Sequence, residues 1–581
     1  MTAERDRERM RLASAPALCS PEAAPAAPAG GTARAARPVR RTGFDAVGAS
    51  HLAPTAAELE QLRRVANGTQ EADLVVRGGM MVVVQTGELR RRDLLIAGRF
   101  IAAVTRPGTL GARRALDASG RYLLPAYVDP YVRLEQTLLT PGELARLVVP
   151  RGTVTLLVDA GLPVTLCGPR GARLVTASGT PVRLLARTSP AGGGTGTRAG
   201  ASLPDTGTWL PRQSVPLVGS ADLSLPGMAG TGAVAGMPGL DGTAVGDRAA
   251  ADRAAADLAA ADLAADDLAA DAPLEFSGAW KITEIADHGH LDRVVRRTVG
   301  AGVEPMAAIR MATLDPARRY GLDHLLGSLA PAHLADIQIV SDIAGSGPPE
   351  IVLVNGRMAA ERGRPLFDNL DVLPDWTRER VTLPSGLFSG SFAVAATAAG
   401  QDSAGPNSAG PVRGVQVSVA ADGTAGVEVV AVRPGRADGG TGHAAADPGH
   451  DLLKVALVTR GADRAGGMRV GFIRGVGLRQ GAIAMATSVA PGDLAVIGVA
   501  DQDMMTAVRA LEGMCGGFVV VDRGWVLAAC PLPVAGLMSD ASWEAVRDQL
   551  AGVDSAAAAL GCTIPSPFLT LAPLGGQLCQ H

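Results

Sequence analysis

Two carboxylates and one guanidinium in the first third of the chain are residue types that could do chemistry. Glu135 and Asp159 could each carry a proton or offer an oxygen to a metal, and Arg133 could bind a polar ligand beside a carboxylate. The simpler alternative is that Arg133 and Glu135 form a structural ion pair, as most such neighbours do. Glu135 and Asp159 are therefore the candidate catalytic residues, and Arg133 is the candidate ligand-binding residue.

Histidine is the commonest metal ligand in proteins, and the histidines of this chain are poorly placed for that role. His288 and His290 are two residues apart, so a helix would point them in different directions, and they are not predicted to be a metal pair. His290 and Asp292 are instead predicted to cap the helix that follows. We predict no metal site and no bound cofactor. The other six histidines are His324 and His333, together with four in segments predicted to be disordered or terminal, His51, His443, His450 and His581.

Composition excludes several classes of protein. The net charge of −3, with basic residues spread along the chain, gives no electrostatic footprint for nucleic acid. No apolar run reaches the ~18 residues of a membrane-spanning helix, and the first 50 residues lack the apolar core of a secretory signal. The six cysteines contain no C-x-x-C pair, which indicates reduced thiols in a cytoplasmic protein. Neither a G-x-S-x-G motif nor a P-loop is present.

The elements that must position the candidate residues follow from local patterns. A helix over Pro141–Val149, with Thr140 as its N-cap, separates the apolar run that ends at Val132 from a predicted buried strand, Thr153–Val158. The order strand, helix, strand favours a parallel β/α unit. Other predicted strands, before and after this unit, are Leu74–Val76, Met81–Val84, Leu94–Ile96, Phe100–Val104, Val182–Ala186, Ala335–Val340 and Ile351–Val354, the last followed by an Asn355-Gly356 turn.

Further along the chain, helices and strands alternate again. Helices are predicted at His290–Gly300 and Pro305–Leu314, and an α/β or α+β domain is predicted between Leu453 and Leu571. Its predicted strands are Val455–Val458, Ala495–Val499 and Gly517–Val521, and its predicted helices are Asp503–Glu512 and Ser542–Leu550.

Three stretches have compositions that do not favour a packed core. Residues 1 to about 50 are dominated by Ala, Pro and Arg. Residues 191–271 end in an Ala-rich repeat in which Asp and Leu each recur every five residues, which leaves no continuous apolar stripe on a helix. The repeat is predicted to be a sequence expansion, the alternative being a functional acidic arm. Residues 391–450 are rich in Gly, Ala and Asp.

Several strings resemble the adenine deaminase family of metal-dependent amidohydrolases. They occur in that family's order and cover more than half of the chain, and the last two are specific to this branch. These strings are ADLVVRGGMMVVVQTGELRRRDLLIAGRFIAAV, LLPAYVDPYVRLEQTLLTPGELARLVVPRGTVTLLVDA, GHLDRVVRRTVGAGVEPMAAIRMATLDPARRYGLDHLLGSLAPAHLADIQIV, VGFIRGVGLRQGAIA, PLPVAGLMSD and CTIPSPF.

The resemblance implies an α/β fold: a (β/α)8-type amidohydrolase barrel, here with few middle strands, a composite β-sandwich and a C-terminal α/β domain. It implies hydrolysis of adenine to hypoxanthine and ammonia with manganese or iron, a purine ligand and a homo-oligomer. The implied division of the chain is 1–70 as a disordered arm and lead-in, 71–120 with 333–366 as sandwich halves, 121–332 as the barrel-derived region with insert 191–271, and 367–581 as the C-terminal domain with insert 391–450.

The chain departs from the family where the metal would bind. Tyr131 and Arg133 stand at the positions of the His-x-His pair, while Glu135 and Asp159 keep family positions. Arginine is a permanent cation with only donors, so it repels a metal. The remaining metal positions fall at Gly161 and Leu162, Phe276 to Ala279, Gly461, and Pro491 to Asp493.

Three hypotheses follow from these departures. The chain is an adenine deaminase family protein with strongly impaired hydrolysis, or a non-catalytic relative that binds a purine or a protein partner, or a decayed reading frame whose central region does not fold. Resistance of the Ala-rich segment to limited proteolysis would count against the last.

Overall fold

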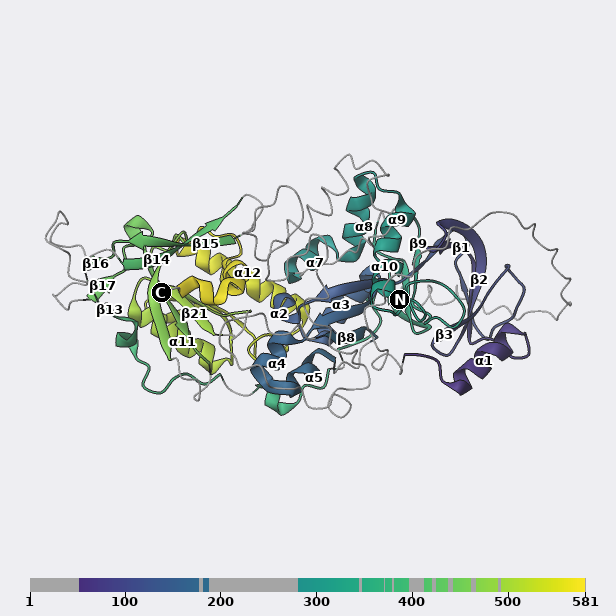
Figure 1. Cartoon of the computed structure of the whole chain (residues 1–581), viewed down its shortest axis with the longest axis horizontal. Coiled ribbons are helices and arrows are strands. Elements are labelled where there is room, and N and C mark those ends of the chain that lie inside the picture. The colour runs from purple at the N-terminus through teal and green to yellow at the C-terminus, as the bar shows by residue number, and fades with distance from the viewer. Residues whose placement is uncertain are drawn as a thin grey trace, which may run out of the picture.

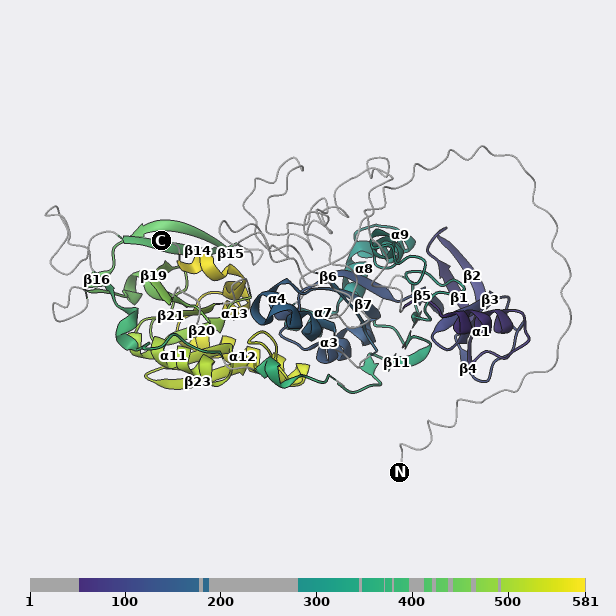
Figure 2. The same ribbon diagram turned by 60° about the horizontal axis from the view of Figure 1, so that its bottom comes forward.

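The computed structural model describes residues 52–176, 181–187, 281–343, 347–369, 371–378, 381–395, 412–420, 425–436, 443–460, 467–488 and 493–579. Three bodies follow one another along the long axis of the molecule (Figures 1 and 2). A composite sheet lies at one end, a set of parallel strands with helices lies in the middle, and a sheet from the C-terminal part of the chain lies at the other end.

The composite sheet contains nine strands from two distant parts of the chain. Its order is β12-β11-β10-β9-β5-β1-β2-β3, with β4 paired to β1. Because β5 pairs antiparallel with β9, the segment after residue 333 joins the N-terminal strands directly. The strands are β1 Leu74–Val83, β2 Glu88–Ala97, β3 Phe100–Thr105, β4 Ala115–Asp117, β5 Tyr122–Pro125, β9 Ile337–Val340, β10 Ile351–Val354, β11 Arg357–Glu361 and β12 Arg364–Pro365.

This sheet is one continuous curved sheet. Apolar side chains from β1 to β3 and from β9 and β10 share one core cluster, so the two ends of the sheet face each other across it. The implied β-sandwich therefore takes the form of a single folded sheet. Asn355 and Gly356 have φ of 50° and 73°, as a tight hairpin turn requires, and this turn was predicted.

The prediction of two separate strands at Leu74–Val76 and Met81–Val84 is wrong, because β1 runs through both. Its register with β2 shifts between Val76 and Gly79, so the two glycines between these segments make a bulge where the sequence indicated a turn. A side chain at position 79 would place its Cβ 2.6 Å from Leu123 Cγ, which explains why only glycine fits there.

The lead-in before residue 71 contains a helix that was not predicted, α1, Ala56–Ala66. Thr55 and Glu58 form a capping box, in which each side chain accepts a hydrogen bond from the other residue's backbone N–H. Leu62 and Val65 are buried in a core shared with β2 and β3. The T-x-x-E signal for this helix was present in the sequence.

The middle body holds three parallel strands in the order β6-β7-β8. Within the described ranges these three strands and the helices around them form this body, and the (β/α)8 barrel stays a prediction. Residues 188–280, which hold the Ala-rich insert, lie outside the described residues. The predicted helix at Pro141 and the strand at Thr153 are confirmed. The elements are β6 Tyr127–Val132, α2 Leu134–Thr137, α3 Pro141–Val148, β7 Thr153–Asp159, α4 Gly161–Cys167, α5 Gly171–Thr176, β8 Arg183–Arg187, α7 Ile282–His288, α8 Leu291–Gly300, α9 Pro305–Met311 and α10 Leu314–Arg319.

The C-terminal body is an eight-stranded sheet in the order β15-β14-β19-β18-β21-β20-β22-β23, with α11 and α12 packed against it. The predicted strands and helices of this body are confirmed with ends shifted by one or two residues, except that the helix predicted to end at Leu550 continues to Ala559. Its elements are β14 Val412–Val419, β15 Ala425–Val432, β18 Leu453–Val458, β19 Met468–Arg474, β20 Ala482–Ala486, β21 Leu494–Gly498, α11 Asp501–Gly513, β22 Gly517–Asp522, β23 Trp525–Pro531, α12 Trp543–Ala559 and α13 Pro567–Leu571.

Part of the predicted low-complexity insert 391–450 is ordered sheet. Its strands β14 and β15 pair along their whole length and join the large sheet through β19. A small three-stranded sheet is formed beside it by β13 Val394–Ala395, β16 Gly435–Arg436 and β17 His443–Ala445. Alternation of valine with polar residues in β14 was the available signal for a strand.

None of the helices in the described ranges is both long and apolar enough to cross a membrane.

Candidate functional site

The carboxyl ends of β6 and β7 lie side by side and carry the candidate residues. Val132 pairs with Val158 in this parallel register, so Arg133, which follows β6, and Asp159, the last residue of β7, lie at the same edge of the sheet. In β/α barrels this edge is where chemistry takes place. We call Arg133, Glu135 and Asp159 the strand-end cluster.

An ion pair joins the first two residues of the strand-end cluster. Arg133 Nε lies 2.9 Å from Glu135 Oε1, and the Glu135 side chain is only 2% exposed. Burial raises the pKa of Glu135, and the charge of Asp159 adds to the rise while Arg133 opposes it. Burial lowers the pKa of Arg133, but Glu135, Tyr131 and Asp159 together hold it above its usual value, so the guanidinium stays charged.

Asp159 has a structural contact as well as a place in the cluster. Its Oδ1 accepts a hydrogen bond of 2.8 Å from the backbone N–H of Gly161, at the beginning of α4. A side-chain oxygen that accepts from the backbone two residues later is typical of a turn that starts a helix. The residue is buried but near enough to Glu135 and Arg133 to influence the pKa of both.

A second polar network, which the sequence did not indicate, lies in the core beside β6. Asp129 Oδ2 lies 3.2 Å from His290 Nε2, and His290 Nδ1 lies 2.9 Å from Thr153 Oγ1, with all three side chains buried. Asp129 Oδ1 also accepts from the backbone N–H of Tyr131 at 3.0 Å. This network therefore ties β6, β7 and the beginning of α8 together beneath the strand-end cluster.

The predicted capping role for His290 and Asp292 is half right. Asp292 Oδ1 accepts a hydrogen bond of 2.7 Å from the backbone N–H of His290, as a cap would. The His290 ring makes no capping hydrogen bond and instead points into the core toward Asp129. His288, two residues earlier, is exposed, so the two histidines do point apart as expected.

The C-terminal body covers the segment that carries Glu135. Ser539 N–H donates to the carbonyl of Leu138 at 2.8 Å, just after α2. Trp543 N–H, at the start of α12, donates to Glu143 Oε2 at 3.0 Å in α3. These contacts explain why Glu135 is buried although it lies on a four-residue helix.

The residues at this edge do not fit a divalent metal. A metal needs several deprotonated ligands that converge, whereas Arg133 places a permanent cation against the one buried glutamate. Over the described ranges, no three His, Cys, Asp or Glu side chains come together in a way that could hold an ion. Of the other metal positions, Phe276 to Ala279, Gly461, Pro491 and Gly492 lie outside the described residues.

His443 and His450 were predicted to lie in disorder, and the structure places both in ordered segments. His443 begins β17, and His450 pairs with Asp447 at 2.7 Å on the surface of the C-terminal body. Both are exposed. His450 lines a pocket of the C-terminal body to which no residue of the strand-end cluster contributes.

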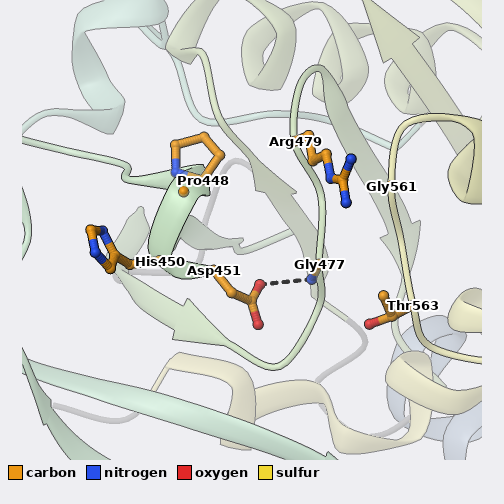
Figure 3. A pocket seen from close by; sticks show the side chains of 8 residues that line it. Pro448, His450, Asp451, Gly477, Arg479, Gly561 and Thr563 are labelled. Carbon is orange, nitrogen blue, oxygen red and sulfur yellow. Dashed lines mark hydrogen bonds between the residues drawn. The ribbon is translucent and has the colours of Figure 1, made fainter.

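That pocket lies in the C-terminal body and is open to solvent (Figure 3). Its central carboxylate, Asp451, accepts backbone hydrogen bonds of 2.7 Å from Gly475 and from Gly477, so it holds the loop in shape. The Asp451 side chain faces Gly477, Arg479 lies on the same loop as Gly477, and Thr563 lies on a separate segment (Figure 3). With its carboxylate engaged in this way, the pocket offers no second catalytic arrangement.

One carboxyl group outside the strand-end cluster has a pKa that is raised toward neutral pH. Burial raises the pKa of Asp554, in α12, to about 6, although a hydrogen bond from Ser566 and the charge of Lys281 both lower it. Its Oδ1 is buried with no hydrogen-bond partner. Because the folded-state pKa is raised, the ionised carboxylate disfavours folding, and this penalty develops as pH rises from the usual carboxyl pKa toward 6 and levels off above about 6.

The variant Asp554→Asn is therefore expected to be more stable than the wild type at pH 8 and equally stable at pH 4. The gain at pH 8 should be about 1 kcal/mol, less than the full pKa shift implies, because Asp554 is partly solvent-exposed. Urea unfolding at both pH values measures the difference. A gain that is the same at pH 4 as at pH 8 would contradict this origin.

Comparisons with known proteins place these features in context. The adenine deaminase C-terminal domain matches residues 434–577, and the amidohydrolase family matches residues 275–359. An adenine deaminase of Moorella thermoacetica is 31% identical over 90% of this chain and 94% of its own length. Those of Methylobacterium nodulans and Methanothrix thermoacetophila are each 31% identical, over 90% and 88% of this chain and 96% and 94% of their own. A solved structure of molinate hydrolase is similar at a TM-score of only 0.35, with 16% identity, over 52% of this chain and 98% of that one.

Proposed function

Since the chain belongs to the adenine deaminase family, we propose that it keeps the family scaffold as a purine-binding protein and does not hydrolyse adenine. The observation that carries the proposal is the Arg133–Glu135 ion pair, at 2.9 Å, where a hydrolytic relative would need a metal. Without a metal, nothing in the strand-end cluster lowers the pKa of water enough to make hydroxide near neutral pH.

The polar groups that remain suit a flat heterocycle. The Arg133 side chain is 23% exposed and its guanidinium offers N–H donors, while the carboxylates of Glu135 and Asp159 offer acceptors. Adenine carries both N–H donors and ring-nitrogen acceptors on its edges, so it can use both kinds of partner. Binding of adenine without turnover is therefore part of the proposal, as are a homo-oligomeric state and a cytoplasmic location.

We expect the purified protein to contain far less than one manganese or iron per chain and to release no ammonia from adenine. Metal content is measured by mass spectrometry, and ammonia release is assayed on the same sample after manganese or iron is added. Isothermal titration with adenine then tests binding on its own. Stoichiometric metal together with turnover would sink the proposal, and it would make Glu135 the first residue to examine as a ligand.

A second candidate function is binding of a protein partner. It is favoured by the exposed apolar side chains Trp525, Val526 and Leu527 on β23, the last strand of the C-terminal sheet. Edge strands with exposed apolar residues can pair with another chain. A protein that binds neither adenine nor hypoxanthine in titration would favour this candidate over the first.

A further inference from the structure

The charges of the strand-end cluster are arranged around Arg133. The guanidinium has Glu135 as its ion-pair partner at 2.9 Å. Asp159 is the second carboxylate close enough to stabilise the charged guanidinium, and it lies at the end of the neighbouring strand. One fixed positive charge is therefore paired with Glu135 and lies close enough to Asp159, at the end of β7, to be stabilised by it as well.

Removal of this positive charge would leave the buried carboxylate of Glu135 without a counter-charge. Its side chain is 2% exposed, and its Oε2 is buried with no hydrogen-bond partner among the described residues. A buried carboxylate is tolerated only when a counter-charge or hydrogen bonds compensate for lost hydration. Among the described residues, the side chain that donates a hydrogen bond to Glu135 is Arg133.

We infer that Arg133 is a built-in counter-ion that takes the place of a divalent metal, so that this edge of the sheet folds without a metal. Removal of the Arg133 guanidinium leaves Glu135 and Asp159 able to bind a divalent cation. This inference rests on the proposed function, because both start from the Arg133–Glu135 pair. Carboxylate oxygens suit manganese, and two of them with no guanidinium between them make an acidic pair that a cation would relieve.

The test is the melting temperature of Arg133→Met in the full chain, with a chelator or with millimolar manganese. The wild type should melt at the same temperature in both. The variant should melt lower by about 5 °C or more with the chelator, because breaking a buried pair is costly, and should regain at least half of that loss with manganese. The double variant Arg133→Met, Glu135→Gln should lose the response to manganese.

Arg296→Met is the matched control. Arg296 Nη1 pairs with Asp292 Oδ2 at 2.9 Å, with side-chain exposures of 28% and 8%, close to those of Arg133 and Glu135. Among the described residues, Asp292 is the one carboxylate that pairs with Arg296, so this variant should lose stability without any recovery in manganese. Recovery of the control to the same extent as Arg133→Met would show a general salt effect and overturn the inference.

Other outcomes separate the two proposals. A wild type that is stabilised by manganese, or an Arg133→Met variant that manganese does not rescue, overturns the counter-ion inference. If Arg133→Met does not fold, refolding is attempted with and without manganese: recovery only with manganese supports the inference, and failure in both overturns it. Ammonia release by the metal-loaded wild type would instead overturn the proposed function.

Discussion

The variant Arg183→Met is expected to lower the free energy of unfolding by about 3–5 kcal/mol, because it leaves a buried carboxylate without its guanidinium. Arg183 begins β8, and its Nη1 donates to Asp336 Oδ2 at 2.7 Å, with both side chains 6% exposed. The same guanidinium donates to Thr155 Oγ1 at 2.9 Å and to Asn355 Oδ1 at 3.0 Å. It thus joins the parallel strands to the composite sheet.

Chemical denaturation followed by circular dichroism measures the loss, and a double-mutant cycle with Asp336→Asn isolates the pair. The double variant should be less destabilised than the sum of the single variants, because a neutral amide in place of Asp336 removes the uncompensated charge. Asp336 also accepts from the backbone N–H of Asn355 at 2.8 Å, and the amide oxygen of asparagine can keep that contact. Strictly additive losses would mean that the two side chains do not act as a pair.

The same interaction shows why part of this fold could not be predicted from the sequence. Arg183 and Asp336 are 153 positions apart, and no local pattern pairs them. Thr140 and Pro141, by contrast, begin α3 as expected, because helix starts depend on neighbouring residues. The Thr140 side chain makes no capping hydrogen bond, so even there the sequence predicted the boundary and missed the contact.

Only part of the strand-end cluster could be predicted from the sequence, because the rest depends on contacts between distant residues. Arg133 and Glu135 are close in sequence, so their ion pair was a natural alternative, and it is the one observed. The proximity of Asp159 depends on the parallel register of β6 and β7, which strand and helix patterns only suggested. The shape of β1 was missed because Gly78 and Gly79 favour a turn locally, whereas pairing with β2 carries the strand through them.

His290 is a histidine with a structural role in the core. The variant His290→Leu is expected to lower the free energy of unfolding by about 3 kcal/mol. Its ring spans from Asp129 Oδ2 to Thr153 Oγ1, both buried, and leucine fills a similar volume without either contact. The loss should be smaller than for a fully isolated charge, because Asp129 keeps the hydrogen bond from Tyr131 N–H.

His288→Leu is the natural comparison, since His288 is exposed and should change stability by no more than about 0.5 kcal/mol. Unfolding of both variants in urea gives the two values directly. The variant Thr153→Val should cost less than His290→Leu, about 1 kcal/mol, because it removes only one neutral hydrogen bond. A loss below about 1 kcal/mol for His290→Leu would mean that the buried Asp129 does not depend on the ring.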